Sequence, residues 1–468
     1  LLLNAMTHKR AIILIFGFGF LLRLVYILYT GILVRQHDLS SFGTPVEAGG
    51  KGHATYIEYF YERFRLPDFD VRRVFQFYHP PLHHMISALW LRLQTGLGIE
   101  YAAALENLQI LTLFYSSACM LLSYRIFGYL KLKGAALIAA CAVIAVHPTF
   151  LMLAGSVNND ILCITLVLAS VVAAFRWYEK PTFPRIILLA LCIGLAMMAK
   201  LSGGIVAIAV ALLMLLRLIY RKISVKRLLA QYTVFGVICI PTALWWQIRN
   251  LVLFDVPLGY VPRLSESADQ YLGNYSVWER FFDFSMRTPW DAYQASATYQ
   301  TLYGYEFFEH NIFYGALKSS LFGEYYIGKN SPIFSGLAAV LFYARILMFA
   351  GAVVGAVYLI YKLVRSIRKP QAFLEEFGTG RALPCFMLLF EAALLVTYVQ
   401  FCFAYPHFCS MDMRYIVPVL VIHAFFFGIF LQKMQKKGTR SARILCWCAG
   451  IVTAVFCIGS ACFYVFAV

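Results

Sequence analysis

Charged residues are scarce in this sequence. Asp, Glu, Lys and Arg make up 13% of the 468 residues, whereas a soluble domain has about 25%. Hydrophobic residues make up 61%, above the roughly 45–50% of soluble domains. This composition excludes an ordinary soluble domain and predicts a polytopic membrane protein, with the lipid bilayer as its surroundings.

Several motifs are also absent. No Walker-type phosphate loop occurs, so a P-loop nucleotide hydrolase is not expected. No Cys/His spacing typical of a zinc site occurs, and no tandem repeat or low-complexity tract interrupts the chain. Lys and Arg exceed Asp and Glu by 40 to 23, yet no nucleic-acid-binding module accompanies that excess. We therefore expect no nucleic-acid partner.

The twelve cysteines do not form a disulfide framework. Most lie inside apolar runs, where a free cysteine behaves as a small hydrophobic residue. Only Cys402 and Cys409 flank a predicted outer segment, and a disulfide between them stays open.

Apolar runs recur along the whole chain, each near the roughly 20 residues that a helix needs to cross a bilayer. The first run, 11–34, has no small-residue cleavage site, so we interpret it as a span rather than a signal peptide. The sequence predicts an all-α membrane protein with one transmembrane domain over 1–468 and about eleven transmembrane helices. The predicted spans are 11–33, 105–127, 134–154, 160–177, 186–201, 203–220, 229–248, 334–361, 383–403, 415–432 and 444–466.

Basic residues indicate the orientation. With the N-terminus inside, every segment expected in the cytoplasm is basic, from Lys9 and Arg10 to the cluster at 433–443, as in the short cytoplasmic loops of other membrane proteins. Two large extracytoplasmic segments remain, 34–106 and 249–332, where we expect short interfacial helices. The short inner loops favour a bacterial plasma (inner) membrane, with the site facing outside.

The stretch "HPPLHHMISALWLRL" begins at His79 and is interrupted by Arg92. A span over 82–98 would move every later loop to the other side and place the basic loops outside, against the orientation rule. Pro80 and Pro81 fix the backbone where the chain turns. We therefore expect a helix that rests in the outer interface.

Polar residues recur in the outer connections between the predicted spans. Taken singly, each could cap a helix, reach the headgroups or pair with a neighbour. Together they predict a polar chamber at the outer boundary of the hydrocarbon. Its members are His37 and Asp38, Asn158 to Asp160, Lys200 and Ser202, Arg249 and Asn250, and Asp412, Arg414 and Tyr415.

Such a chamber suits transfer of a sugar from a lipid phosphate. The acyl tail would lie between helices, with the phosphate against Lys200, Arg249 and Arg414. Fixed cations stabilise the charge that a leaving phosphate gains in the transition state. An aspartate at the water edge could serve as the base for the attacking hydroxyl.

With these residues the sequence resembles the polytopic GT-C glycosyltransferases, in the branch of protein O-mannosyltransferases and lipid A aminoarabinose transferases. The resemblance covers nearly the whole chain and rests on short motifs in the same order. They are Asp38 after the first span, "GHATYIEYF" with His53 and Tyr56, "YHPPLHH" with His79, "NND" ending in Asp160, "AKLSG" around Lys200, "WWQIRN" around Arg249, and "DMRYIVP" around Arg414.

The resemblance implies roles for these residues. It makes Asp38 the catalytic base and places Asp160, a second acid, in the same cavity. It also gives the Pro-Pro segment a part in holding the donor phosphate, although His79 stands where some relatives have Lys. The residues expected to bind substrate are His37, His53, Tyr56, His79, Asn159, Lys200, Arg249, Asn250, Arg414 and Tyr415.

The resemblance predicts a polyprenyl-phosphate-linked sugar as donor and an unknown acceptor on the extracytoplasmic side. Two other functions stay open: a transporter or flippase of a lipid-linked or small polar substrate, and an oligosaccharide ligase that uses a diphosphate carrier. No cofactor is required by the sequence. A divalent cation could be held by His37, Asp38, His53 and Asp160, although no tight ligand spacing supports it.

Two charged residues fall in the middle of predicted spans, Arg23 in the first and Glu391 in the ninth. An unpaired charge there costs about 2.5–3.5 kcal/mol on insertion scales. We expect the two residues to pair with each other.

Overall fold

The structure is a computed structural model that describes residues 2–32, 52–220, 223–268, 270–285, 309–323, 332–368 and 370–466. His37 and Asp38 lie outside these residues. Within them the chain is helical, with one isolated β-bridge between Tyr271 and His407 and no strand. The all-α prediction is therefore confirmed.

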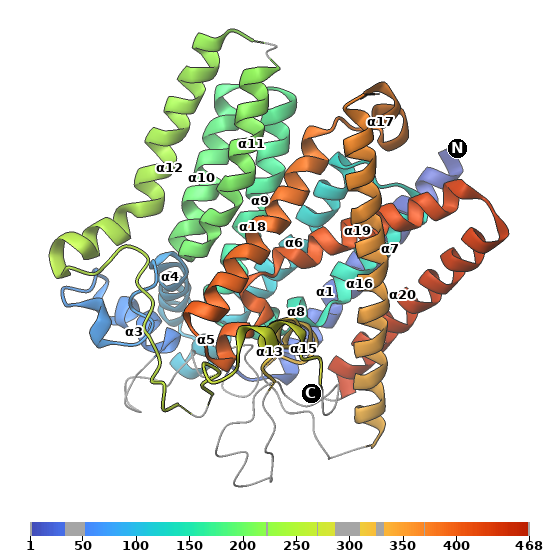
Figure 1. Cartoon of the computed structure of the whole chain (residues 1–468). Helices are drawn as coiled ribbons and strands as arrows, with labels where there is room; N and C mark the ends of the chain where they lie inside the picture. Colours follow the sequence, from blue (N-terminus) through green and yellow to red (C-terminus); the bar gives the residue numbers. More distant parts are fainter. Residues whose placement is uncertain are drawn as a thin grey trace.

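Ten helical segments of the described chain are long and apolar enough to cross a membrane. The remaining predicted span, 186–201, corresponds to the shorter apolar helix α10 (Phe183–Ala199). Figure 1 shows these helices as one bundle. The ten segments belong to the following helices: α1 (Leu2–Tyr29), α5 (Tyr101–Glu106) with α6 (Gln109–Tyr129), α7 (Gly134–Val146) with α8 (Pro148–Gly155), α9 (Asp160–Glu179), η3 (Leu201–Ile205) with α11 (Val206–Ile219), α12 (Val225–Phe254), α16 (Pro332–Ser366), α18 (Ala382–Ala404), α19 (Pro418–Lys437) and α20 (Arg440–Phe466).

Short helices gather at one end of the bundle, opposite α17 (Pro370–Phe377) and the N-terminus (Figure 1). They are α3 (His53–Arg63), α4 (Leu82–Gly96), α13 (Val277–Phe282) and α15 (Ile312–Phe322). All four fall within the two segments predicted to lie outside. At 15 residues, α4 is shorter than the roughly 20 residues that a spanning helix needs.

The third apolar run breaks into α7 and α8 at Pro148, because proline has no N–H to donate to the carbonyl four residues earlier. Arg23 of α1 donates to the carbonyls beside this break, at 2.5 Å from Ala145 O and 3.4 Å from Ile144 O. Its Nε donates to Ser116 Oγ at 2.8 Å. The buried guanidinium thus meets backbone and hydroxyl oxygens, and the expected pairing with Glu391 is wrong.

Glu391 of α18 instead accepts from His423 of α19, with 2.9 Å between Oε1 and Nε2. The other ring nitrogen of His423, Nδ1, lies 3.4 Å from Nη2 of Arg345 in α16. Because a guanidinium only donates, Nδ1 accepts and the imidazole proton is on Nε2. A neutral histidine therefore connects a carboxylate and a guanidinium across three helices.

A double-mutant cycle distinguishes the observed pairing from the expected one. Replacing Glu391 with leucine should destabilise the protein by about 3–5 kcal/mol, because Arg345 loses its buried counter-charge. Replacing Glu391 with glutamine should cost less, because the amide oxygen still accepts from His423. In thermal unfolding, Glu391→Leu should couple to Arg345→Met but not to Arg23→Met. Coupling to Arg23 alone would contradict this arrangement.

Candidate functional site

A small cavity lies where α9, α11, α18 and α19 meet. One part of its wall is polar and is formed by Asp160, Lys200, Ser202, Arg414 and Tyr415. The remaining lining residues are Cys163, Ile164, Val167, Ile205, Val206, Phe390, Leu394 and Pro418. A site with a charged part and an apolar part suits an amphipathic ligand.

Asp160 and Lys200 form an ion pair at the polar part of the cavity. Asp160 is the first residue of α9, where the partial positive charge of the helix N-terminus favours a carboxylate. Lys200 follows the last turn of α10 and comes before η3. The side chains are only 3% and 13% exposed, so each charge depends on the other for compensation.

Tyr415 lies between the two cations of the cavity, in η5 (Met413–Tyr415) just before α19. The centre of its ring is 4.9 Å from Lys200 Nζ and 5.0 Å from the guanidinium carbon of Arg414. Arg414 Nη2 donates to the Tyr415 hydroxyl at 3.0 Å. Burial raises the pKa of Tyr415, so its hydroxyl keeps a proton that it can donate to a ligand.

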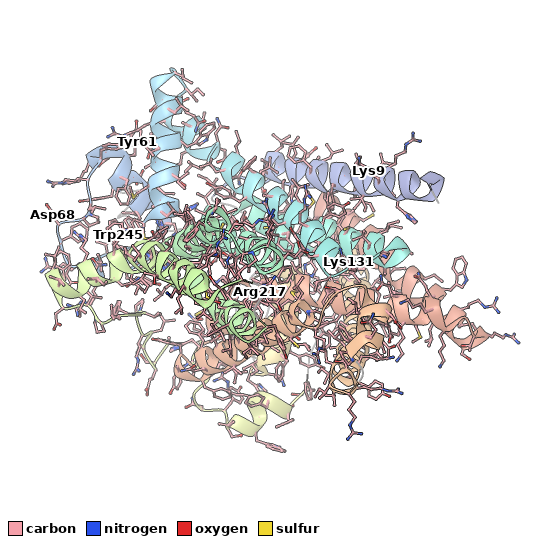
Figure 2. The ribbon with its side chains drawn as sticks, turned by 90° about the horizontal axis from the view of Figure 1, so that it is seen from above. Lys9, Tyr61, Asp68, Lys131, Arg217 and Trp245 are labelled. Atoms are coloured by element: carbon pink, nitrogen blue, oxygen red, sulfur yellow. The ribbon has the colours of Figure 1, made fainter. Side chains whose placement is uncertain are left out.

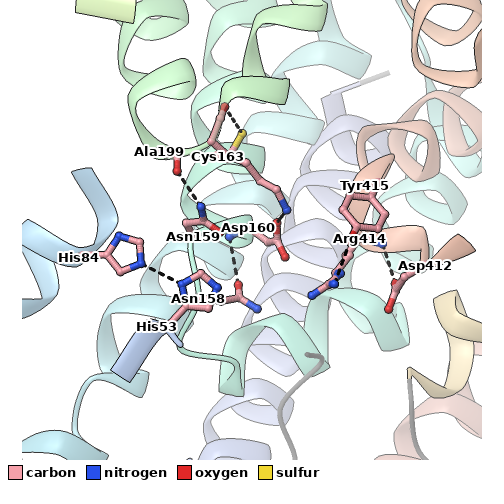
Figure 3. Close-up of polar contacts among 11 residues, drawn as sticks. His53, His84, Asn158, Asn159, Asp160, Cys163, Ala199, Asp412, Arg414 and Tyr415 are labelled. Carbon is pink, nitrogen blue, oxygen red and sulfur yellow. Dashed lines mark hydrogen bonds and ion pairs between the residues drawn. The ribbon is translucent and has the colours of Figure 1, made fainter. Parts of the chain in front are cut away.

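Asp412 fixes the backbone of this turn. Its Oδ1 accepts from the backbone N–H of Arg414 at 2.8 Å, and its side chain is fully buried. Figure 3 shows Arg414 and Tyr415 on one side of Asp160, and His53 and His84 on the other.

The second group of site residues is a histidine cluster between α3 and α4. His53 Nδ1 and His84 Nε2 share a hydrogen bond of 2.8 Å, and the His84 ring stacks on Tyr56 with 4.2 Å between centres. His79 stacks on His53 at 5.9 Å. Burial lowers the pKa of His53 and His84 well below the usual value, and the pKa of His83 to about 3. These imidazoles are therefore neutral at pH 7.

The histidine cluster makes the α3–α4 unit sensitive to acid. The pKa values of His53, His83 and His84 are lower in the folded protein than the usual 6.5, so an opened unit binds more protons. Stability is then complete above pH 6.5 and falls at lower pH, by up to about 1.4 kcal/mol per pH unit for each histidine. The protection of α3 and α4 against hydrogen exchange, measured relative to the intrinsic exchange rate at each pH, should fall from pH 6.5 to 5. His83→Phe should reduce this fall, and unchanged protection would contradict the expectation.

Arg249 and Asn250, near the end of α12, do not line the cavity. The guanidinium of Arg249 donates to Pro67 O and, at 2.8 Å, to Asn250 Oδ1. It also lies 5.1 Å from the ring centre of Trp246, whose indole donates to Tyr78 O at 3.3 Å. These contacts attach the segment between α3 and α4 to α12, and Figure 2 shows Asp68 of that segment on the same side of the molecule as Trp245.

The structure thus divides the site residues predicted from sequence into groups. Asp160, Lys200, Arg414 and Tyr415 meet at one cavity. His53, Tyr56 and His79 lie in the histidine cluster, Asn159 immediately precedes Asp160, and Arg249 and Asn250 face the segment between α3 and α4. His37 and Asp38 lie outside the described residues, and so their roles stay predictions.

Sequence reasoning did not identify the apolar wall of the cavity. Phe390 and Leu394 of α18 and Pro418 of α19 contribute to it. No sequence motif around them distinguishes them from lipid-facing residues. Phe390 and Leu394 are four residues apart and so lie on one face of α18. Among the described residues, no three His, Cys, Asp or Glu side chains are placed to hold a metal ion, and the metal reading that includes His37 and Asp38 stays a prediction.

Comparison with solved structures defines the class of the fold. The oligosaccharyltransferase AglB of Archaeoglobus fulgidus, in complex with an inhibitory peptide and a dolichol-phosphate, is 11% identical over 98% of this chain and 56% of its own, with a TM-score of 0.55. The apo form of an oligosaccharyltransferase from Archaeoglobus fulgidus is 12% identical over 97% of this chain and 56% of its own, with a TM-score of 0.52. ArnT of Cupriavidus metallidurans, bound to undecaprenyl phosphate, is 12% identical over 97% of this chain and 76% of its own, with a TM-score of 0.49.

The fold is that of the GT-C membrane glycosyltransferases, and the resemblance drawn from the motifs is confirmed at the level of this superfamily. The chain spans about half the length of the archaeal oligosaccharyltransferase. Within the superfamily, residues 78–246 match the model of the family described as dolichyl-phosphate-mannose-protein mannosyltransferase. No curated protein sequence matches the chain.

Proposed function

We propose that the protein is a glycosyltransferase that moves a sugar from a polyprenyl-phosphate donor to an acceptor on the extracytoplasmic side. The observation that carries this proposal is the cavity, where Asp160, Lys200, Arg414 and Tyr415 stand beside an apolar, helix-lined wall. The phosphate would lie at the polar part and the prenyl tail along the wall. The dolichol-phosphate bound by the archaeal oligosaccharyltransferase of similar fold supports a lipid phosphate as ligand.

The proposed roles follow from the chemistry of transfer. The bond between the sugar C1 and the phosphate oxygen breaks, and a bond from the acceptor oxygen to C1 forms. Asp38 takes the proton of the acceptor hydroxyl, as the family resemblance implies. Lys200 and Arg414 stabilise the leaving polyprenyl phosphate, and the Tyr415 hydroxyl donates to it. Asp160 orients Lys200 through their ion pair.

Transfer by purified protein tests the proposal. Detergent-solubilised protein, given a polyprenyl phosphate that carries a labelled sugar and membrane-envelope acceptors, should release polyprenyl phosphate and label an acceptor. A transporter or flippase would move its substrate only between the two sides of a membrane and would form no product in detergent. Uptake by proteoliposomes without any transfer in detergent would therefore contradict the proposal.

A further inference from the structure

Two neighbouring asparagines at the turn between α8 and α9 each leave one buried amide atom without a partner. Asn158 and Asn159 are 2% and 1% exposed. Asn158 Oδ1 accepts from the backbone N–H of Asp160 at 3.0 Å, whereas its Nδ2 has no hydrogen-bond partner. Asn159 Nδ2 donates to Ala199 O at 2.9 Å, whereas its Oδ1 has none.

The bonds that are made fix which atom of each amide is oxygen and which is nitrogen. An oxygen must face the N–H of Asp160, and a nitrogen must face the carbonyl of Ala199. Neither amide can therefore be reversed. The turn consequently offers an unused NH2 group, from Asn158, next to an unused acceptor oxygen, from Asn159.

Such groups are costly when buried, at about 1–3 kcal/mol each. Helix capping does not explain them, because Asn159 occupies the N-cap position of α9 without a side-chain capping bond. Natural structures leave few buried polar groups without a partner, and a missing ligand or water is a usual reason. The two amides therefore indicate that something polar binds here.

The surroundings define the chemistry of that ligand. Figure 3 shows Asn158 and Asn159 between the His53–His84 pair and Asp160. Val157 belongs to the same apolar cluster as Ala54 and Tyr56 of α3, the helix that carries His53. His84 Nδ1 is a further buried nitrogen without a partner. Amides and neutral imidazoles offer hydrogen bonds without net charge.

We propose that Asn158 and Asn159 form a subsite for the hydroxyl groups of a neutral sugar. A hydroxyl both donates and accepts, so two neighbouring hydroxyls match an amide N–H next to an amide oxygen. This inference rests on the proposed function. A sugar one bond away from a phosphate at Lys200 would lie beside Asp160, next in the chain to this pair. Asp160 is already paired with Lys200, and the two amides carry no charge, so an amino sugar or a uronic acid would find no unpaired counter-charge here.

The test compares the binding of a polyprenyl phosphate that carries a sugar with the binding of one that carries none. In Asn158→Ser, the hydroxyl can still accept from the Asp160 N–H, but the unused N–H donor is removed. We expect the KM for a polyprenyl phosphate carrying a neutral hexose to rise about tenfold. The inhibition constant of polyprenyl phosphate without a sugar should change less than about twofold. The wild type should also prefer the neutral hexose to an amino sugar, and the variant should lose part of that preference.

Asn311 offers a matched control. It is the N-cap of α15, and its amide is fully used, with bonds to the N–H groups of Phe313 and Tyr314 and to the carbonyls of Phe281 and Asp283. Asn311→Ser should lower the unfolding temperature without changing the ratio of the two constants. Asn158→Leu provides a second variant of similar size that removes both amide atoms and should raise the ratio as well.

Three outcomes would overturn the subsite. Both constants could stay unchanged in Asn158→Ser, which would mean that the amides hold only water. Both could rise together, which would place the pair in phosphate binding or in folding. A wild type that neither transfers sugar nor is inhibited by polyprenyl phosphate would overturn the proposed function and the subsite together, whereas normal wild-type transfer with an unchanged ratio overturns the subsite alone.

Discussion

Replacing Lys200 with methionine is expected to lower the rate of sugar transfer by at least about a hundredfold, the usual effect of removing one preorganised charge at a transition state. It should also destabilise the protein by about 3–5 kcal/mol, because Asp160 would remain as a buried carboxylate without its partner. Both effects are measurable on one preparation, by transfer assay and by thermal unfolding.

A second substitution separates the two effects. In Lys200→Met with Asp160→Asn, no buried charge is left unpaired, so most of the lost stability should return. Transfer should not return, because the cation that faces the phosphate is still absent. Recovery of transfer in the double variant would show that Lys200 serves only to neutralise Asp160, and the proposed phosphate site would then be wrong.

Replacing Asp38 with asparagine is expected to reduce transfer by about 10²–10⁴-fold, the usual range for loss of a general base. Asparagine has nearly the same size but cannot accept the proton of the acceptor hydroxyl. Inhibition by polyprenyl phosphate should be unchanged within about twofold, because the phosphate cations are intact. The pair of measurements therefore assigns Asp38 to the chemical step rather than to donor binding.

Asp38→Glu serves as the control for this prediction, because it keeps the carboxylate and moves it by one methylene. It should retain more activity than Asp38→Asn. An Asp38→Asn protein that transfers sugar at the wild-type rate would refute the base, and one that no longer binds polyprenyl phosphate would assign Asp38 to the binding site instead.

The bundle was predictable because apolar runs of about 20 residues have few alternatives to a membrane helix. The basic loops also separated the short helix α4 from the spans, since a further span would have reversed every later loop. The break at Pro148 is local and could have been expected from proline in an apolar run. The contact that satisfies the carbonyls at this break could not have been expected, because Arg23 comes from another helix.

The candidate site was predictable in part. Asp160, Lys200, Arg414 and Tyr415 lie at or next to the ends of predicted spans on the same side, so depth alone placed them near one another. Arg249 satisfied the same rule, but α12 continues to Phe254, and the guanidinium turns toward the segment between α3 and α4. The rotation of a helix about its own axis decides such a case, and it depends on packing partners that are distant in the sequence.

The same limit applies to paired charges inside the bundle. Arg23 and Glu391 have opposite charges at similar depth, which is why pairing was expected. Each has a nearer partner that a sequence does not reveal: carbonyls beside a helix break for Arg23, and His423 for Glu391. Complementary charge at equal depth is therefore a weak guide to contact when several helices compete.

The most direct test of the donor cavity is an experimental structure of the protein with polyprenyl phosphate bound. The phosphate is predicted to lie within hydrogen-bonding distance of Lys200 and Arg414, with the first prenyl units against Phe390 and Leu394. A phosphate bound beside Arg249, with the space between Asp160 and Tyr415 empty, would contradict the account.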